Sequence, residues 1–233
     1  MAVVEVVGVK KDYVDRGAGT THALRGVDLA VESGEFMAIA GPSGSGKTTL
    51  LNLIGGLDTP TAGSVKVDGR ELATMTSAQL SDLRRDRIGF VFQAYNLIPV
   101  LSAEENAEYV MELKGVGSGA RHERIEGLFE RLGLAELRHK RPPKMSGGQQ
   151  QRVAVARAIA AEPAVVLADE PTANLDQATG RALIEMMREL NRERKVTFIF
   201  STHDPMVLEQ ADRVVRLVDG AVTSDDRKAG GAL

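Results

Sequence analysis

The segment Gly41 to Thr48, with the sequence GPSGSGKT, constrains the fold of this chain more than any other. It follows the apolar run Phe36 to Ala40 and precedes TTLLNLI, which has the apolar content of a helix packed on a sheet. A glycine-rich loop between a buried strand and a helix binds phosphate, because its backbone N–H groups can wrap an anion. Lys47 then reaches the terminal phosphates, and the Thr48 hydroxyl can ligate Mg²⁺. The alternative, an ordinary glycine-rich turn, is disfavoured by this strand–loop–helix context.

Polar residues follow three further apolar runs. AVVLADEP ends in Asp169 and Glu170, where the first carboxylate can hold Mg²⁺ through water and the second can act on an attacking water as general base. The alternative is a carboxylate pair that caps a turn. Gln93 follows IGFVF and His203 follows VTFIFST, but a polar residue after a buried strand is common. Tyr13 alone favours a half-buried edge aromatic over a base-stacking platform. A functional role for these last three residues is supported only when they are considered together with the other motifs.

A second helix start with glycines lies at KMSGGQQQR, residues 144–152. Its simplest interpretation is a Ser146 N-cap followed by two small residues that pack closely. That interpretation leaves one cost unexplained, since each glycine inside a helix costs about 1 kcal/mol relative to alanine. Free N–H groups at such a start also form an anion site. The chain therefore has two helix starts that can face phosphate.

Strands followed by helices predict an α/β fold with a mostly parallel sheet covered on both faces. The first forty residues favour strands and hairpins, and RVVRLVDGAVT favours a final hairpin with an Asp-Gly turn. Thr76 with Gln79, and Ser102 with Glu105, have the spacing of capping boxes. Residues 94–150 favour a helical insertion. Ligands of such sheets bind beyond the carboxyl ends of the strands, where the polar residues above are found.

Composition excludes several classes of function. The formal net charge is −3 and the chain has no cysteine, which disfavours a nucleic-acid-binding surface, disulfides and thiolate metal sites. No apolar run is long enough to span a bilayer, and the lysines after the first apolar stretch reverse the order of a signal peptide. We expect a cytoplasmic chain that reaches a membrane only through a partner.

The set of motifs resembles the nucleotide-binding subunit of an ATP-binding cassette (ABC) transporter. The motifs occur in the family's order over about residues 3–222: Tyr13, GPSGSGKTT, FVFQ, MSGGQQQR, VVLADEPTANLD and STHD. Three segments are similar in sequence to the branch of lipoprotein-releasing (LolD) and macrolide-exporter (MacB) ATPases: GGLDTPTAGSV, FVFQAYNLIPVLSAEEN and LADEPTANLD.

This resemblance implies a single nucleotide-binding domain over residues 1–225 and a loose tail over 226–233. The domain would have a RecA-like P-loop NTPase core with an N-terminal antiparallel β subdomain, at about residues 1–93 and 151–222. A helical subdomain, at about residues 94–150, would lie between the Q-loop at Gln93 and the signature motif.

The resemblance also implies roles for matching positions. Tyr13 would stack on adenine, Glu170 would activate the attacking water, and His203 would contact the γ-phosphate, with Lys47 and Gln93 completing the catalytic set. Mg²⁺ would be held by Thr48 and Gln93, and by Asp169 through water. The ATP phosphates would be held by Gly41, Pro42, Ser43, Gly44, Ser45, Gly46, Lys47, Thr48 and Thr49.

In this family the signature motif meets the ATP held by a second subunit, in a head-to-tail dimer with two shared sites. The signature residues here are Ser146, Gly147, Gly148 and Gln149. Residues 173–176, ANLD, resemble the D-loop that crosses to the other subunit. Met145 replaces the usual signature leucine, a change of similar size with little expected effect. No catalytic position is substituted, so the resemblance implies an active ATPase.

The resemblance implies ATP hydrolysis by a homodimer that drives permease subunits of the FtsX/MacB-like type at the cytoplasmic face of the inner membrane. The expected process is export, lipoprotein release or mechanotransmission of the LolD/MacB type. An ABC-type ATPase of DNA repair is a second hypothesis. It predicts a coiled coil or zinc module between the P-loop and the signature, where this chain has neither heptads nor cysteine. A third is a cell-division regulator similar to FtsE. ABC translation factors normally fuse two cassettes, whereas this sequence has one.

Overall fold

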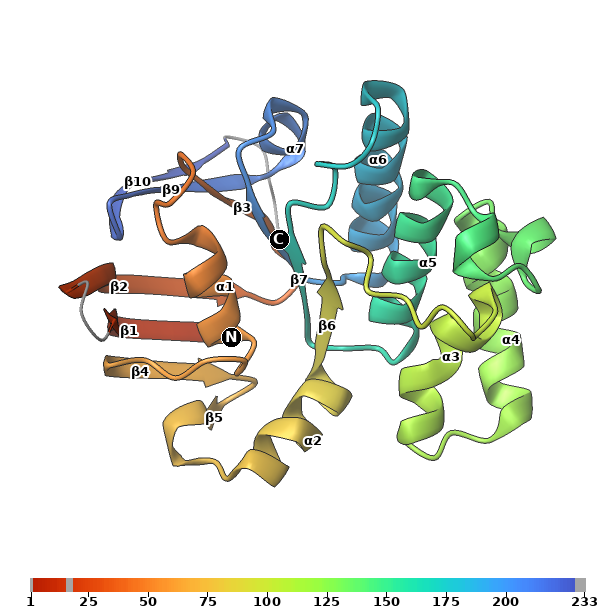
Figure 1. Cartoon of the computed structure of the whole chain (residues 1–233), viewed down its shortest axis with the longest axis horizontal. Coiled ribbons are helices and arrows are strands. Elements are labelled where there is room, and N and C mark those ends of the chain that lie inside the picture. Colours follow the sequence, from red (N-terminus) through yellow and green to blue (C-terminus); the bar gives the residue numbers. More distant parts are fainter. Residues whose placement is uncertain (1, 16–18, 229–233) are drawn as a thin grey trace.

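Two sheets organise the residues that the computed structural model describes, which are 2–15 and 19–228 (Figure 1). The larger is six-stranded with the order β10-β9-β3-β8-β7-β6. All its neighbouring strands are parallel except β10, which pairs antiparallel with β9. This confirms the predicted mostly parallel sheet. Its strands are β3 (Phe36–Ala40), β6 (Ile88–Val91), β7 (Val165–Asp169), β8 (Phe198–Thr202), β9 (Arg213–Val218) and β10 (Ala221–Arg227).

The second sheet is four-stranded and antiparallel, with the order β2-β1-β4-β5. It lies at the left of Figure 1 and confirms the N-terminal strands and hairpins expected from the sequence. Its strands are β1 (Ala2–Asp15), β2 (Gly19–Glu32), β4 (Ala62–Val67) and β5 (Arg70–Glu71).

The helices begin where the sequence places caps. Both predicted capping boxes are present, with Thr76 before α2 and Ser102 before α3. The α-helices are α1 (Lys47–Ile54), α2 (Ser77–Arg87), α3 (Ala103–Leu113), α4 (Ser118–Arg131), α5 (Gly147–Ala160), α6 (Gln177–Arg194) and α7 (Pro205–Gln210). Short 3-10 helices span Leu72–Thr74, Ala135–Leu137 and Pro142–Lys144.

The alternation of strand β3 explains the layers. Phe36, Ala38 and Ala40 pack into the apolar cluster under α5 and α6. Met37 and Ile39 point to the other face, into the cluster shared with α1 and the antiparallel sheet. All five side chains are buried, as expected for a central strand covered on both faces. Helix α1 contacts strands of both sheets and so is held between them, directly after the P-loop.

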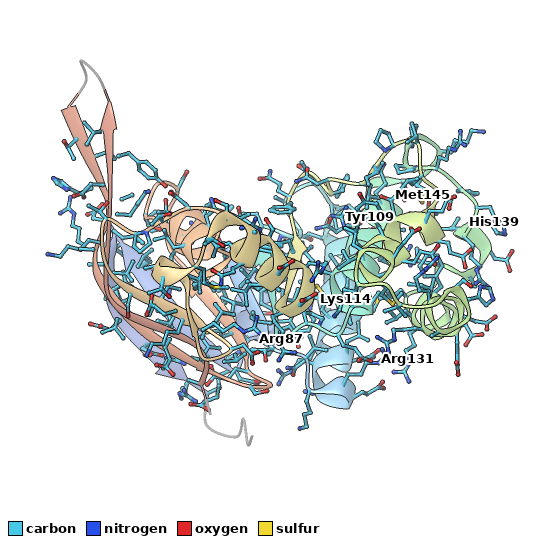
Figure 2. The ribbon with its side chains drawn as sticks, turned by 90° about the horizontal axis from the view of Figure 1, so that it is seen from below. Arg87, Tyr109, Lys114, Arg131, His139 and Met145 are labelled. Carbon is cyan, nitrogen blue, oxygen red and sulfur yellow. The ribbon has the colours of Figure 1, made fainter. Side chains whose placement is uncertain are left out.

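Helices α3 and α4 form a separate lobe at the right of Figure 1, which we call the helical lobe (residues 103–144). It shares one continuous apolar cluster with α5, α6 and the sheet, which joins the lobe to the rest of the described chain. Lys114, at the end of α3, donates to the carbonyl oxygens of Asp86 and Ala161. Figure 2 shows Lys114 at the junction of the two lobes. The proposed division of the chain near residues 94 and 150 stays a prediction.

One boundary expected from the sequence was wrong. Strand β10 runs to Arg227, so residues 226 and 227 are not a loose tail. Asp226 pairs with Val214 and Arg227 with Arg213, and the Arg227 guanidinium lies 2.9 Å from the Glu35 carboxylate, which fixes this end. Residues 229–233 of the predicted tail lie outside the described residues. Strand β6 ends at Val91, which leaves Gln93 in the following loop. Within the described ranges, every helix is too short or too polar to cross a bilayer.

Candidate nucleotide site

The P-loop, which is the segment GPSGSGKT at residues 41–48, closes around its own lysine. The Lys47 ammonium donates to the carbonyl oxygens of Gly41 and Pro42, at 2.8 and 3.0 Å, and the side chain is buried. Gly46 precedes α1 in the left-handed conformation, with φ of 102°. A Cβ atom there would lie 2.5 Å from the carbonyl oxygen of Ala23, so only glycine fits this turn. The backbone therefore enters the helix with no side-chain cap over its first turn.

The strand ends bring the predicted metal ligands together. The Thr48 hydroxyl donates to Asp169 Oδ1 at 3.1 Å, joining the start of α1 to the end of β7. Gln93, from the loop after β6, lines the same cavity as Thr48. A hydroxyl, an amide oxygen and a carboxylate are the hard oxygen donors that Mg²⁺ prefers, so this donor set fits the ion.

Glu170 is held at its carboxylate and strained at its backbone. Oε1 lies 2.7 Å from His203 Nδ1, and Oε2 accepts from the Thr202 hydroxyl at 3.0 Å. Its φ of 44° is unusual for a residue other than glycine, and such strain concentrates at functional sites. The sequence placed Glu170 and His203 after different strands. The parallel register of β7 and β8 brings them into contact, because Asp169 lies beside Ser201.

A cavity of about 420 Å³ opens beyond these strand ends. It combines P-loop residues with Gln93, Glu170 and His203, as the sequence predicted. Its lining also contains residues that sequence reasoning missed, from the hairpin strand β2 and the D-loop. The full lining is Thr21, His22, Ala23, Ser43, Gly44, Ser45, Gly46, Lys47, Thr48, Thr49, Gln93, Glu170, Ala173 and His203. The β2 residues carry no motif, so only the fold reveals them.

Tyr13 is not part of this cavity lining, and its ring is partly exposed. Its hydroxyl donates to Asp58 at 2.9 Å, and the Lys11 ammonium lies 4.9 Å from the ring centre. Partial burial and the bond to Asp58 raise the pKa of the Tyr13 phenol above its usual value. Burial opposes ionisation of Asp58, but the hydrogen bonds from Lys11, Thr59 and Tyr13 outweigh it and lower the pKa of that carboxyl. Lys11 and Asp58 thus fix the ring.

The signature residues form a capped helix start away from the P-loop cavity. Ser146 Oγ accepts from the Gln149 N–H at 3.3 Å, and Gln149 Oε1 accepts from the Ser146 N–H at 3.0 Å. A Cβ on Gly147 would lie 2.6 Å from the Tyr95 hydroxyl, and one on Gly148 would lie 2.4 Å from Thr179 Cγ2. The close packing expected for the glycine pair is therefore present. None of the four signature residues lines the cavity that holds Lys47.

Side chains from α5 and the D-loop hold the backbone of the Q-loop, and the sequence analysis missed them. Gln151 is fully buried and donates to the carbonyl oxygens of Phe92 and Pro171. Asn174 donates to the Gln93 carbonyl at 2.9 Å. Arg157 donates to the carbonyls of residues 95 and 96, and burial away from water lowers the pKa of its guanidinium. Helical periodicity offers a signal for Gln151, which lies three residues after Gly148 on the buried face of α5.

Known proteins match this arrangement along almost its whole length. The family described as ABC transporter matches residues 24–173. The lipoprotein-releasing system ATP-binding protein LolD of Anaeromyxobacter dehalogenans is 48% identical, over 95% of this chain and 93% of that protein. The macrolide export ATP-binding/permease protein MacB of Aggregatibacter actinomycetemcomitans is 42% identical, over 98% of this chain but 35% of its own length.

A solved structure carries the same fold with nucleotide products bound. It is a dimeric structure of the ATP-binding cassette MJ0796 in a post-hydrolysis state with ADP and Pi. It is 40% identical with a TM-score of 0.89, and the match covers 97% of this chain and 99% of that chain. The motifs, the fold and these relatives agree. The chain belongs to the ABC transporter family, as a nucleotide-binding ATPase subunit of the LolD and MacB branch.

Proposed function

We propose that two copies of this chain close head to tail on ATP, so that each nucleotide lies between one P-loop and the other copy's signature helix. The observation that carries this proposal is the separation of Ser146 to Gln149 from the cavity around Lys47 within one chain. Both helix starts suit phosphate, and a second copy lets them face the same phosphate. The dimeric structure of MJ0796 with ADP and Pi supports the association of two copies.

In the proposed site, Glu170 acts as general base and His203 contacts the γ-phosphate. The carboxylate has two hydrogen-bond partners and borders the cavity, so it is held ready to take a proton from water. Lys47 lies among the P-loop carbonyls, from which its ammonium can turn to the phosphates. Residues 41–49 hold the phosphates, and Tyr13, fixed by Asp58, stacks on adenine. Thr48, Gln93 and Asp169 hold Mg²⁺, which would neutralise phosphate charge.

Substitution of Glu170 by Gln tests the shared site. The amide keeps the size of the side chain but cannot accept the proton from water, so we expect loss of ATP turnover. ATP binding should persist and trap a dimer, measured by size-exclusion chromatography with light scattering in ATP and Mg²⁺. The matched control is the same variant in ADP, which should stay monomeric. A variant that stays monomeric at saturating ATP and Mg²⁺ would show that the shared-site proposal is wrong.

We also propose that the dimer drives a permease of the FtsX/MacB-like type at the cytoplasmic face of the inner membrane. A mainly apolar groove of about 460 Å³ supports a docking place at the junction of the lobes. Leu57 and Phe90 line its sheet side and Tyr109 and Val110 its helical side, while Ile98 comes from the loop between β6 and α3. Figure 2 shows Tyr109 near this junction. The Q-loop residues Phe92 and Asn96 also line the groove, which connects it to Gln93.

Co-purification with the membrane partner tests this second proposal. A four-helix subunit with a large external domain would support it, and a multi-helix importer with a binding protein would overturn it. Tyr109→Glu should release the partner, because a charge in an apolar groove is costly. Val218→Glu is the matched control, since the two side chains are 38% and 39% exposed and Val218 does not line the groove.

A further inference from the structure

A chain of hydrogen bonds joins Thr172, which directly precedes the D-loop (residues 173–176), to the carboxylate of Glu170. The Thr172 hydroxyl donates to Asp204 Oδ2 at 2.5 Å. The backbone N–H of Asp204 donates to the Thr202 hydroxyl at 3.0 Å, and that hydroxyl donates to Glu170 Oε2 at 3.0 Å. Thr172 stands in the loop after β7, whereas Thr202 is the last residue of β8 and Asp204 follows that strand. The chain therefore connects two loops that the sequence treats as separate motifs.

The donors and acceptors in this chain allow only one direction. A backbone N–H can only donate, so the Thr202 hydroxyl accepts from Asp204 and has its single proton left for Glu170. Both oxygens of the Asp204 carboxylate are engaged, Oδ2 by Thr172 and Oδ1 by the N–H of Met206 at 2.9 Å. The side chain of Thr202 is fully buried and that of Thr172 nearly so. Water cannot easily replace either contact, so the loss of either hydrogen bond would leave a buried polar group without a partner, which is costly.

The two hydrogen-bond partners of Glu170 differ in how exposed they are, and therefore in how readily each can move away from the carboxylate. His203 is a largely exposed side chain that borders the cavity, where the proposed function gives it a phosphate contact. Thr202 is buried and lies on the side of the carboxylate away from His203's contact, at the other oxygen. When His203 turns to the phosphate, Thr202 is the contact that still orients the carboxylate. Its orientation in turn depends on Asp204 and Thr172.

We propose that Thr172 and Asp204 are positioning residues for Glu170, and that they make the orientation of the base depend on the seating of the D-loop. This inference rests on the proposed role of Glu170. Thr172 is buried directly before the D-loop, whereas Ala173 and Asn174 are exposed residues of the loop and would face the second copy. The Asn174 side chain also holds the Gln93 carbonyl. Formation of the dimer would thus seat the loop and complete the base together.

A purely structural role offers a different account of the same contacts. Asp204 caps α7 through its bond to Met206, and that role needs no connection to Glu170. Thr172→Val separates the two accounts, because it removes the hydroxyl at nearly constant volume and leaves the α7 cap untouched. Thr172→Ser keeps the hydroxyl and should keep the function. Thr197→Val is the matched control, since it removes another buried hydroxyl, bonded to the Gly34 N–H at the opposite end of β8.

The experiment is steady-state ATP turnover of the full chain with saturating Mg²⁺. We expect Thr172→Val to lower kcat roughly 10-fold to 100-fold, the cost of a misplaced reacting group. The KM for ATP should change less than about 2-fold, because the P-loop contacts are intact. Thr172→Ser should restore kcat, and Thr197→Val should leave it unchanged. A kcat of Thr172→Val within about 2-fold of the parent, or a raised KM alone, would overturn the inference.

Combination with Glu170→Gln shows through which residue Thr172 acts. If Thr172 acts only on the base, adding Thr172→Val to Glu170→Gln leaves the ATP-trapped dimer intact. Loss of that dimer would overturn the inference and assign Thr172 to the interface. If Glu170→Gln alone keeps its turnover, the proposed base role fails and the inference fails with it. Should Thr172→Val fold poorly, Asp204→Asn replaces it, since asparagine still caps α7 but presents an amide in place of the second carboxylate oxygen.

Discussion

Helices α1 and α5 both begin with glycine-rich loops that suit phosphate, yet their first turns are built in opposite ways. Helix α1 follows Gly46 in the left-handed conformation, with no side-chain cap. Helix α5 follows Ser146 in extended conformation, and a full capping box ties Ser146 to Gln149. An uncapped start keeps its N–H groups for a ligand, whereas a capping box satisfies two of them internally. One chain thus contains an open phosphate cradle, the uncapped start of α1, and a second cradle at the start of α5, whose N–H groups are partly hydrogen-bonded within the chain.

The difference fits the proposal that a second chain completes the site at the start of α5. The cradle of α1 opens on a cavity with a lysine, a carboxylate pair and a histidine nearby. The start of α5 borders a different cavity, of about 300 Å³, whose lining is Gly148, Arg152, Ala178, Thr179, Ala182, Leu183 and Met186, without lysine, carboxylate or histidine. Met145 and Gly148 are buried behind this helix start. A helix start that is stable without ligand can still add the dipole and the glycine N–H groups to a phosphate brought by another subunit. Four substitutions test this contrast.

Lys47→Ala should have the largest effect, because it removes the only ammonium among the residues lining the open cradle. We expect loss of ATP binding and a fall in kcat on the order of 10²–10³-fold or more, as when a charge-stabilising donor is removed. Isothermal titration with ATP and Mg²⁺ measures the first, and phosphate release the second. Lys10→Ala, on strand β1 outside the cavity, is the control. Retention of tight binding by Lys47→Ala would place the phosphates elsewhere.

Ser146→Asp should break the shared site while keeping the helix. Aspartate is an excellent N-cap, so the unfolding temperature of the monomer should stay the same or rise. Its negative charge would face the phosphate of the other copy, so the ATP-dependent dimer and turnover should be lost. Ser146→Ala is the counterpart: it loses about 1 kcal/mol of cap stability but adds no repulsion. If Ser146→Asp still dimerises on ATP in the Glu170→Gln background, the signature serine does not face phosphate.

The motifs and the fold class were predictable from the sequence because each depends on local order along the chain. The P-loop, the capping boxes at Thr76 and Ser102, and the polar residues after β7 and β8 all follow from spacing and periodicity. The Glu170–His203 contact and the β2 residues of the cavity were not predictable, since they depend on strand order in a sheet built from distant segments. The sequence did not predict that Arg227 belongs to a strand, because the residues around it are polar. Arg227 is held in β10 by backbone pairing with β9 and by the ion pair with Glu35.

Gly148→Ala should have an intermediate effect with a specific remedy. The added Cβ would lie 2.4 Å from Thr179 Cγ2, so α5 and α6 must separate at a cost of about 1–3 kcal/mol. Thr179→Ser removes that methyl group and should restore most of the free energy of unfolding in the double variant. Chemical denaturation of both variants and of Thr179→Ser alone measures the coupling. Additive costs would show that contact with the Thr179 methyl group is not what requires glycine at position 148.

Met145→Leu should have the smallest effect, although Met145 stands directly before the capped serine. Its side chain is buried in the cluster shared by the helical lobe and α5, and Figure 2 shows it within that lobe. Leucine is apolar and of similar volume, so the free energy of unfolding should change by less than about 1.5 kcal/mol. The backbone bonds of residue 145, its N–H to Pro142 and its carbonyl from Gln150, do not depend on the side chain. Turnover should therefore stay within about 2-fold of the parent. A larger loss of turnover at unchanged stability would mean that the packing of residue 145 behind Ser146 sets the orientation of the start of α5. The apolar core would then control how this helix start faces phosphate.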